Sequence, residues 1–412
     1  MTPDSADYRE LHVRSAFSFL RGASSPEVIA DRVGKCGLPA MALCDRDGFY
    51  GSVRFHQRAT SNGFRAIVGT ELTMSDGSVL PVLMKNCRAY RAVSRLLTRA
   101  QLRSPKGQCA LEWKELEEVA EDIAVLTGDA EGPLDVAWHR DGARGMEEAI
   151  KTLRRHVPER NLYLEMQRHA VRGEEALIRA KCDLAAAHGL PLLATNGVTY
   201  ALPENRQVQD VFTCLRHHTT LDGAGRRLAV NGERHVKTAA EMSELFWDHP
   251  DAITNTRRLA EVIDFSLENL GYEFPSYDVP EGHSMDSFLA EMTWSGAKER
   301  YGKLPPAVKA QIMKELDLIT RLGFSGYFLI VWSLVRYCRE NGIMVQGRGS
   351  AANSAVCYSL GITPVDPVGA RLLFERFLSE GRKSWPDIDL DLPSGEQREQ
   401  VIQEVYRRYG RH

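Results

Sequence analysis

Short apolar segments alternate with helical segments along the first half of the chain, and this alternation constrains the fold more than any other feature. The segment from Ser25 to Gly37 is typical of a helix, because Ser25 can cap its start, Pro26 suits the first turn and Gly37 suits the end. Such an alternation predicts an α/β fold with a largely parallel sheet or barrel. The apolar segments, typical of buried strands, are AMALCD, AIVGTE, VLPVLM, IAVLTG, LYLEMQ and PLLATN at 40–45, 66–71, 79–84, 123–128, 162–167 and 191–196.

Several of these predicted strands end in a polar residue, namely Asp45, Glu71 and Asn196. In α/β barrels the carboxyl ends of the strands face the active site, so metal ligands would gather there. The simpler alternative is that strands end in polar residues because loops are exposed to water. The pattern alone favours this second explanation.

Composition limits the classes of protein to which the chain can belong. Its 412 residues predict two or three domains, and its net charge of −3 gives no general basic surface. No apolar run is long enough to span a bilayer and no leader opens the chain, so we expect a cytoplasmic protein with no membrane partner. The eight cysteines form no CxxC pair, which indicates reduced, mostly buried thiols.

The first half resembles the PHP (polymerase and histidinol phosphatase) domain through ELHVRSAFSFLRGAS, AMALCDRDGFYG, IVGTEL and LLATNGVTY. The resemblance implies a distorted (β/α)7 barrel that, in active members, binds several metals and hydrolyses phosphoesters. Its ligand positions are incomplete here. The opening HxH reads HVR, so Arg14 replaces a histidine, and the DH pair reads Asp45-Arg46. The late NDVHY-like segment reads NGVTY at 196–200, without its aspartate and histidine.

These replacements predict a barrel that is intact but catalytically inactive. Metal clusters need several imidazoles or carboxylates converging on the ion, whereas Arg14 and Arg46 bring fixed positive charge. We expect the remaining ligands, His12, Asp45 and Glu71, to pair with these arginines as a degenerate PHP site. Residual metal binding is the alternative.

The chain is expected to divide near residue 270. Residues 271–285, GYEFPSYDVPEGHSM, are rich in Gly, Pro and Ser and predict a linker. We therefore expect a PHP domain with a helical extension at 1–270 and a second domain at 286–412. Two helices are predicted at the start of the second domain, PPAVKAQIMKELDLITRLG and GYFLIVWSLVRYCRENG.

The segment PDIDLDL places three aspartates at alternating positions, Asp387, Asp389 and Asp391. On a strand they share one face, while Ile388, Leu390 and Leu392 face the core. Carboxylates at this spacing repel one another unless a cation intervenes, and their oxygens suit Mg²⁺. The alternative is a solvated acidic edge strand, which would carry charges on both faces. We favour the metal site.

A phosphate-binding turn is predicted about forty residues upstream. A strand at 343–345 leads into a glycine-rich turn and then into small residues suited to a helix start. Close backbone N–H groups, a hydroxyl and a guanidinium can together hold a triphosphate. Such a turn paired with an acidic strand is how a nucleotidyltransferase holds a triphosphate and two metals. The residues of the turn are Gly347, Arg348, Gly349 and Ser350.

The second half resembles the palm of the C-family bacterial DNA polymerases, the DNA polymerase III alpha-subunit family, through QGRGSAANSAVCYSLGI and WPDIDLDLPSG. FSFLRGAS and SPKG are similar to its error-prone, damage-inducible branch. The resemblance implies part of a nucleotidyltransferase-like (polymerase beta-type) α+β palm that extends primer–template DNA with dNTPs. It also implies two Mg²⁺ ions on Asp387 and Asp389, a weaker role for Asp391, phosphate contacts from the glycine–serine turn, and no organic cofactor.

The family also uses a third catalytic aspartate, thumb, fingers and a segment that binds the sliding clamp, all downstream of His412. We therefore expect this chain to bind nucleotide and Mg²⁺ weakly and to be inactive alone, with clamp and damage-tolerance partners bound elsewhere. The competing functions are a PHP-type phosphoesterase or 3′–5′ exonuclease and a non-catalytic scaffold.

The last helix, from Ser394, is predicted to begin with a capping box formed by Ser394 and Gln397. Its basic side chains suit either the DNA backbone or water, and the sequence favours neither. They are Arg398, Arg407, Arg408 and Arg411, with Arg376, Arg382 and Lys383 nearby.

Overall fold

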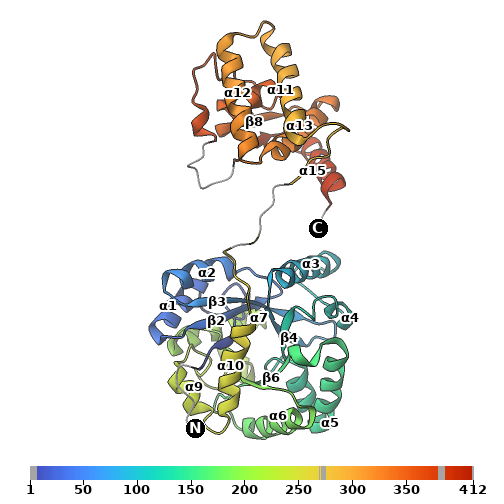
Figure 1. Ribbon diagram of the computed structural model, residues 1–412. Coiled ribbons are helices and arrows are strands. Elements are labelled where there is room, and N and C mark those ends of the chain that lie inside the picture. Colours follow the sequence, from blue (N-terminus) through green and yellow to red (C-terminus); the bar gives the residue numbers. More distant parts are fainter. Residues whose placement is uncertain (1–6, 269, 271–274, 379–385, 411–412) are drawn as a thin grey trace. The chain divides into compact units, whose positions relative to one another are not determined.

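The computed structural model describes residues 7–268, 270, 275–378 and 386–410. The chain forms two compact units, Met1–Leu270 and Gly271–His412 (Figure 1). Each unit has its own hydrophobic core. Among the described residues no single helix is long and apolar enough to cross a membrane. One bent pair of helices, Pro306–Arg321 with Ser325–Glu340, has the length and apolar composition of a membrane span when the two are taken together.

The first unit is built on a seven-stranded sheet whose strands lie in sequence order. Neighbouring strands are parallel except on both sides of β4, which is antiparallel to β3 and β5. The β3–β4 connection is a short turn, too short for the crossover that a parallel pair needs. The strands are β1 (Glu10–Val13), β2 (Ala40–Arg46), β3 (Arg65–Thr73), β4 (Val79–Met84), β5 (Ile123–Leu126), β6 (Leu162–Met166) and β7 (Leu192–Ala194).

The two ends of this sheet approach each other. The segment after β7 pairs with the end of β1 through a Val13–Val198 bridge, in which Arg14 N donates to Val198 O at 2.8 Å. The barrel-like α/β fold implied by the PHP resemblance is thus confirmed, and each of the six strands predicted for this unit overlaps an observed one. β1 was not predicted from its residues, because four residues alternating charged and apolar carry little strand signal.

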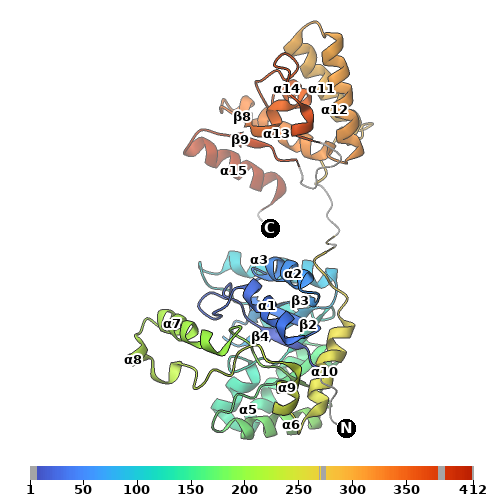
Figure 2. The same cartoon turned by 90° about the vertical axis from the view of Figure 1, so that its left-hand side faces the viewer.

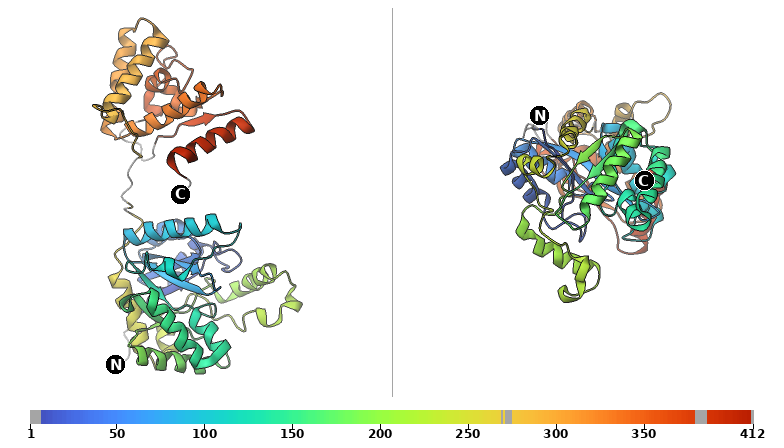
Figure 3. Two further views of the ribbon diagram at one scale, coloured as in Figure 1. Left: turned by 90° about the vertical axis from the view of Figure 1, so that its right-hand side faces the viewer. Right: turned by 90° about the horizontal axis from the view of Figure 1, so that it is seen from below.

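Helices surround the sheet, and α1 has the ends that its sequence predicts. Ser25 Oγ accepts a bond from Val28 N at 3.4 Å, and Gly37 ends the helix with φ 66°. Figures 2 and 3 show α7 and α8 standing away from the barrel. The helices are α1 (Pro26–Cys36), α2 (Ser52–Ser61), α3 (Cys87–Arg103), α4 (Trp113–Leu116), α5 (Pro133–His156), α6 (Glu174–His188), α7 (Arg206–Arg216), α8 (Leu221–Ala224), α9 (Ala239–Leu245) and α10 (Pro250–Val262).

The second unit packs helices around a core that includes Phe328, Phe374 and Phe377. A two-stranded antiparallel sheet, β8 (Gln346–Arg348) with β9 (Asp389–Asp391), lies beside that core. The two helices predicted at its start are observed. The helices are α11 (Met285–Tyr301), α12 (Pro306–Arg321), α13 (Ser325–Glu340), α14 (Ala355–Ser359) and α15 (Glu396–Tyr409).

Two local predictions for this unit are wrong. Residues 343–345 are not a strand, because Ile343 N donates to Cys338 O at 2.8 Å and Gly342 has φ 67°, so the segment completes the end of α13. The expected capping box of α15 does not form either. That helix begins at Glu396, and the residue at its N-cap is Gly395, which has no side chain to cap the helix.

Candidate functional site

In the first unit a buried ion network surrounds Glu71, at the end of the sheet where degenerate PHP ligands were expected. Glu71 Oε1 accepts a hydrogen bond from Arg14 Nε at 2.6 Å and lies 2.7 Å from His12 Nε2. Its Oε2 accepts a hydrogen bond from Arg46 Nε at 2.7 Å. Arg46 is the register partner of Glu71 across β2 and β3. His12 and Arg14 flank Val13, so both side chains point to the same face. Both carboxylate oxygens of Glu71 are therefore held by cations.

Further carboxylates extend the network. His12 Nδ1 lies 2.7 Å from Glu165 Oε1, and Arg14 Nη2 lies 2.8 Å from Asp129 Oδ2. Arg46 Nη2 donates to Glu131 Oε2 at 2.6 Å. Arginine side chains are therefore paired with three carboxylates at this end of the sheet, those of Glu71, Asp129 and Glu131.

The pKa values of these groups follow from burial and pairing. Burial is the largest influence on Glu71 and would raise its pKa, but Arg14 and Arg46 hold the pKa well below its usual range. Burial would likewise lower the pKa of His12, yet the Glu165 and Glu71 carboxylates raise it to about 10. The imidazole is therefore protonated at neutral pH, a state that cannot bind a metal.

Asp45 differs from the expectation that it would pair with an arginine. Its carboxylate instead accepts bonds from Ser15 N at 2.9 Å, Ser18 Oγ at 2.8 Å and Gly51 N at 3.0 Å. Burial raises the pKa of the Asp45 carboxyl, although the hydrogen bonds act to lower it. Asp45 is therefore satisfied locally by the loop that follows β1 and by the start of α2.

Asn196 also lies outside the ion network. Its Nδ2 donates to Glu233 O at 2.8 Å and to His235 O at 2.7 Å, and its backbone N–H donates to Glu10 Oε2. Asn196 therefore anchors the segment 233–235 rather than an ion. Among the residues the structure describes, no three His, Cys, Asp or Glu side chains are grouped as a metal-binding cluster.

Sequence reasoning missed several members of the network. Glu165 lies inside the predicted strand 162–167 and Asp129 directly follows 123–128, so the rule of polar strand ends could have found both. Arg234, which lies 3.3 Å from Asp129 Oδ2, comes from a loop with no such signal.

The raised pKa of His12 generates a testable prediction. Because the folded-state pKa of about 10 exceeds the ordinary value of about 6.5, protonated His12 stabilises the fold fully below about pH 6.5. This stabilisation declines by up to about 1.4 kcal/mol per pH unit and is lost as the pH rises through the folded pKa. We expect NMR of ¹⁵N-histidine-labelled protein to show the His12 ring still protonated at about pH 8. A midpoint below about pH 7 would contradict the network.

In the second unit β8 and β9 bring the predicted turn and the predicted metal strand together. Across the two strands, Arg348 lies opposite Asp389 and Gly347 lies opposite Leu390. A Cβ on Gly347 would lie 2.7 Å from Ile362 O, so this close approach requires glycine. The turn and the acidic segment, distant in sequence, are thus fixed side by side.

The side chains of the acidic segment alternate as predicted. Ile388 is 9% exposed and packs in the core, whereas Asp387, Asp389 and Asp391 are exposed. Asp391 forms an ion pair with Arg348. Gly349, with φ 63°, places its backbone near Asp389, because a Cβ there would lie 3.8 Å from Asp389 Oδ2.

The helix start expected to hold phosphate is already occupied by a carboxylate. Glu315, a buried residue of α12, accepts bonds from Ala355 N and Val356 N at 3.0 Å each, and from Ser354 Oγ at 2.7 Å. Burial raises the pKa of Glu315 against these bonds. α14 begins at Ala355, after a 3-10 turn over Gly349–Asn353, so the helix does not follow the glycine-rich turn directly.

Removing Glu315 should loosen the segment behind the glycine-rich turn. We expect Glu315→Ala to leave the Ala355 and Val356 amides unpaired in a buried site, a loss of about 1–3 kcal/mol. Hydrogen exchange followed by mass spectrometry should then show faster exchange over 355–359. Glu299→Ala, at an exposed position of α11, is the matched control and should leave this exchange unchanged. Equal exchange in both variants would refute the role of Glu315.

The expected basic face of α15 is partly neutralised. Arg407 Nη2 lies 2.6 Å from Glu404 Oε1, and Arg408 Nε lies 2.6 Å from the same oxygen. Arg398 is exposed and has no ion pair among the described residues. Arg382, Lys383 and Arg411 lie outside the described residues.

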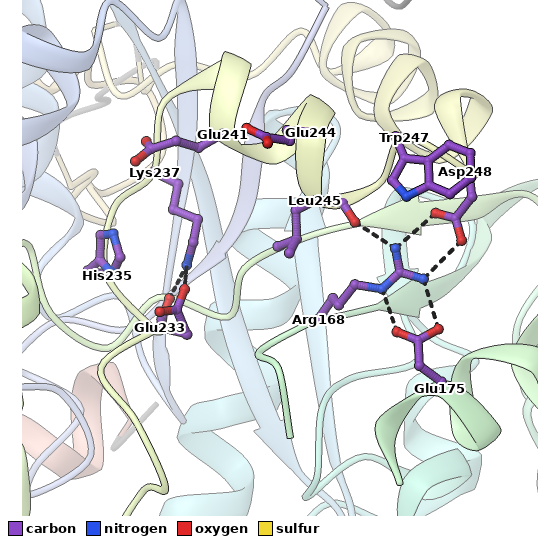
Figure 4. A pocket seen from close by; sticks show the side chains of 10 residues that line it. All are labelled: Arg168, Glu175, Glu233, His235, Lys237, Glu241, Glu244, Leu245, Trp247 and Asp248. Atoms are coloured by element: carbon purple, nitrogen blue, oxygen red, sulfur yellow. Dashed lines mark hydrogen bonds and ion pairs between the residues drawn. The ribbon is translucent and has the colours of Figure 1, made fainter. Parts of the chain in front are cut away.

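A hollow of about 720 Å³ opens beside Arg168 in the first unit (Figure 4). Arg168 is bound by Asp248 at 2.8 Å and by Glu175 at 2.9 Å, and Lys237 is bound by Glu233. Both cations of this wall are therefore already paired with carboxylates.

Each unit is similar to a known protein family. Residues 10–169 match the PHP domain, and residues 287–412 match the bacterial DNA polymerase III alpha NTPase domain. The error-prone DNA polymerase of Mycolicibacterium paratuberculosis is 41% identical over 421 residues, covering 99% of this chain and 38% of that protein. The error-prone DNA polymerase of Brucella abortus is 41% identical over 414 residues, which cover 98% of this chain and 37% of that protein. The chain thus spans about two fifths of the length of these relatives.

Among solved structures, a putative metal-dependent phosphoesterase from Bifidobacterium adolescentis aligns with 47% of this chain and 88% of its own, at 15% identity and a TM-score of 0.34. A likeness this weak does not establish kinship, so the identification depends on the sequence matches. The predicted resemblance to error-prone C-family DNA polymerases, with a PHP domain, is confirmed.

Proposed function

We propose, from its kinship with error-prone DNA polymerases, that this chain serves in a DNA-directed DNA polymerase that adds dNTPs to a primer 3′ end and tolerates damaged template. The observation that carries the proposal is the exposed pair Asp387 and Asp389 beside the turn of residues 347–350, within a match to the polymerase III alpha family. Primer–template DNA and dNTPs are the proposed partners. Sliding clamp and damage-tolerance proteins would bind outside this chain.

The carboxylates of the segment 387–391 fit Mg²⁺. Carboxylate oxygens on one face of a strand suit an ion that keeps waters and takes phosphate oxygens as further ligands. Asp387 and Asp389 would hold the metals, while Asp391, already paired with Arg348, would contribute less. When bound, two Mg²⁺ ions neutralise the charge that develops during phosphoryl transfer.

The proposed phosphate contacts fall on the glycine-rich turn. The α14 amides are engaged by Glu315, and Gly347 N already donates to Ile362 O at 2.6 Å, so Gly349 and Ser350 would supply the donors while Gly347 shapes the turn. Arg348 offers a guanidinium at the same place, provided that it leaves Asp391 when a triphosphate binds. Glu315 would act indirectly, by fixing the segment that follows the turn.

The barrel is proposed to be inactive as a phosphoesterase. A metal cluster would have to displace Arg14 and Arg46 from Glu71 and to deprotonate His12. The phosphoesterase alternative is therefore disfavoured, and the barrel would serve as a structural partner of the polymerase. No third catalytic carboxylate is assigned in this chain, so we expect no primer extension from it alone.

The metal assignment predicts distinct effects for neighbouring aspartates. Asp387→Asn with Asp389→Asn should lower Mg²⁺-dependent dNTP affinity of this chain by about tenfold or more, since each removes a charged ligand. Asp391→Asn should change the affinity less than about threefold. Isothermal titration calorimetry with dATP, with and without Mg²⁺, measures both. Equal losses from the pair and from Asp391→Asn would refute the assignment.

The inactive barrel makes a second prediction. The chain should not degrade a 5′-labelled single-stranded oligonucleotide in Mn²⁺ or Zn²⁺, because the ligand positions carry fixed positive charge. Denaturing gel electrophoresis over several hours measures degradation. Metal-dependent cleavage that disappears in a His12→Ala variant would instead support the phosphoesterase function.

A further inference from the structure

A second hollow, of about 1010 Å³, opens at the strand ends next to the Glu71 network. Loops after β1, β2 and β3, the end of α3 and the end of α7 contribute to its wall. Its cationic side chains come from elements that are far apart in the sequence, so no sequence pattern reveals them as a group. They are Arg21, Arg46, Lys106 and Arg216.

The positive charge of this wall exceeds what the neighbouring carboxylates neutralise. Glu131 is already shared by Arg21, at 2.8 Å, and Arg46, at 2.6 Å. Asp47, the carboxylate in the described wall, accepts bonds from Thr73 N and Thr73 Oγ1 at 2.8 Å each. The network behind the wall has no carboxylate to spare, because Glu71, Asp129, Glu131 and Glu165 are already paired with His12, Arg14, Arg46 and Arg234, and Arg21 is a further cation on Glu131.

Arg216 and Lys106 carry the excess. Neither makes an ion pair or a side-chain hydrogen bond with another described residue, and Arg216 is only partly exposed at the last position of α7. Burial and the neighbouring Arg21 lower the pKa of Arg216. A partly buried guanidinium without a protein partner is costly unless an anion completes its environment. Arginine is suited to phosphate because its planar fork matches two oxygens.

Aromatic side chains line the same space. Phe19 is 80% exposed and Tyr50 is 54% exposed, and Phe17, at 38%, lies under the Arg54 guanidinium. Large aromatic faces left in water beside cations are what single-stranded nucleic-acid sites use, since bases stack on the rings while the phosphates meet the cations. A hollow of this volume exceeds the need of a single phosphate ion.

We propose that this hollow binds single-stranded nucleic acid without a metal and without cleaving it. Arg216 and Lys106 contact its phosphates, with Arg21 at the edge of the same wall. Phe19 and Tyr50 provide faces for its bases. This site belongs to the first unit and does not depend on the polymerase site proposed for β8 and β9.

Fluorescence anisotropy with a short fluorescein-labelled oligodeoxythymidine and the full chain, in EDTA, tests the proposal. We expect Arg216→Glu with Lys106→Glu to weaken binding about tenfold or more and to reduce its dependence on salt. Arg95→Glu with Lys35→Glu gives the same charge change on exposed positions of α3 and α1, outside the hollow, and should have less than about a threefold effect. Thermal unfolding checks that all variants fold.

The location and the ligand class are tested separately. Hydrogen exchange with bound oligonucleotide should show protection over 104–110 and 215–218. Phe19→Ala with Tyr50→Ala should weaken oligonucleotide binding but not the binding of a polyglutamate peptide. The proposal is wrong if the hollow variants bind like wild type, if protection appears only in 346–350 and 387–391, or if polyglutamate binds as tightly as the oligonucleotide.

Discussion

The buried carboxylate of Glu71, held between Arg14, Arg46 and His12, is the interaction on which the end of the barrel depends. These groups come from β1, β2 and β3, so one charge cluster ties together three strand ends. A buried charge that lacks its partner destabilises the fold by several kcal/mol, so the Glu71 carboxylate needs these cations and they need Glu71. The arginines that stand at the expected ligand positions therefore also stabilise this end of the barrel.

The second unit depends on contacts between distant segments rather than on a charge cluster. β8 and β9 pair across about forty residues, and Glu315 reaches from α12 to the start of α14. A short strand pair of this kind is marginal alone and needs a helical core behind it. Ile388 supplies that link, since its side chain is in the core and its N–H donates to Tyr327 Oη at 3.0 Å. The exposed aspartates are thereby attached to a rigid element.

The sequence predicted the elements that burial dictates and missed those that local hydrogen bonds decide. Apolar runs identified six strands because both faces of that sheet are covered. The pattern could not distinguish a strand at 343–345 from the end of α13, since Ile343 is buried in either case. It also could not show that Asp45 would bind serine hydroxyls instead of arginine, because that choice depends on the loop after β1. Nor could it show that the amides at the start of α14 are capped by Glu315, because that residue is about forty positions away in the sequence.

The two acidic clusters of this chain differ in how their charge is neutralised, and this difference separates the barrel network from the candidate metal site. In the barrel every oxygen of Glu71 already faces a protein cation, and Asp129 and Glu131 are paired as well. In the segment 387–391 only Asp391 has such a partner among the described residues, and Asp387 and Asp389 are exposed. Neighbouring carboxylates without a protein cation favour one from solution. We therefore expect added Mg²⁺ to act on the second unit and to leave the barrel unchanged.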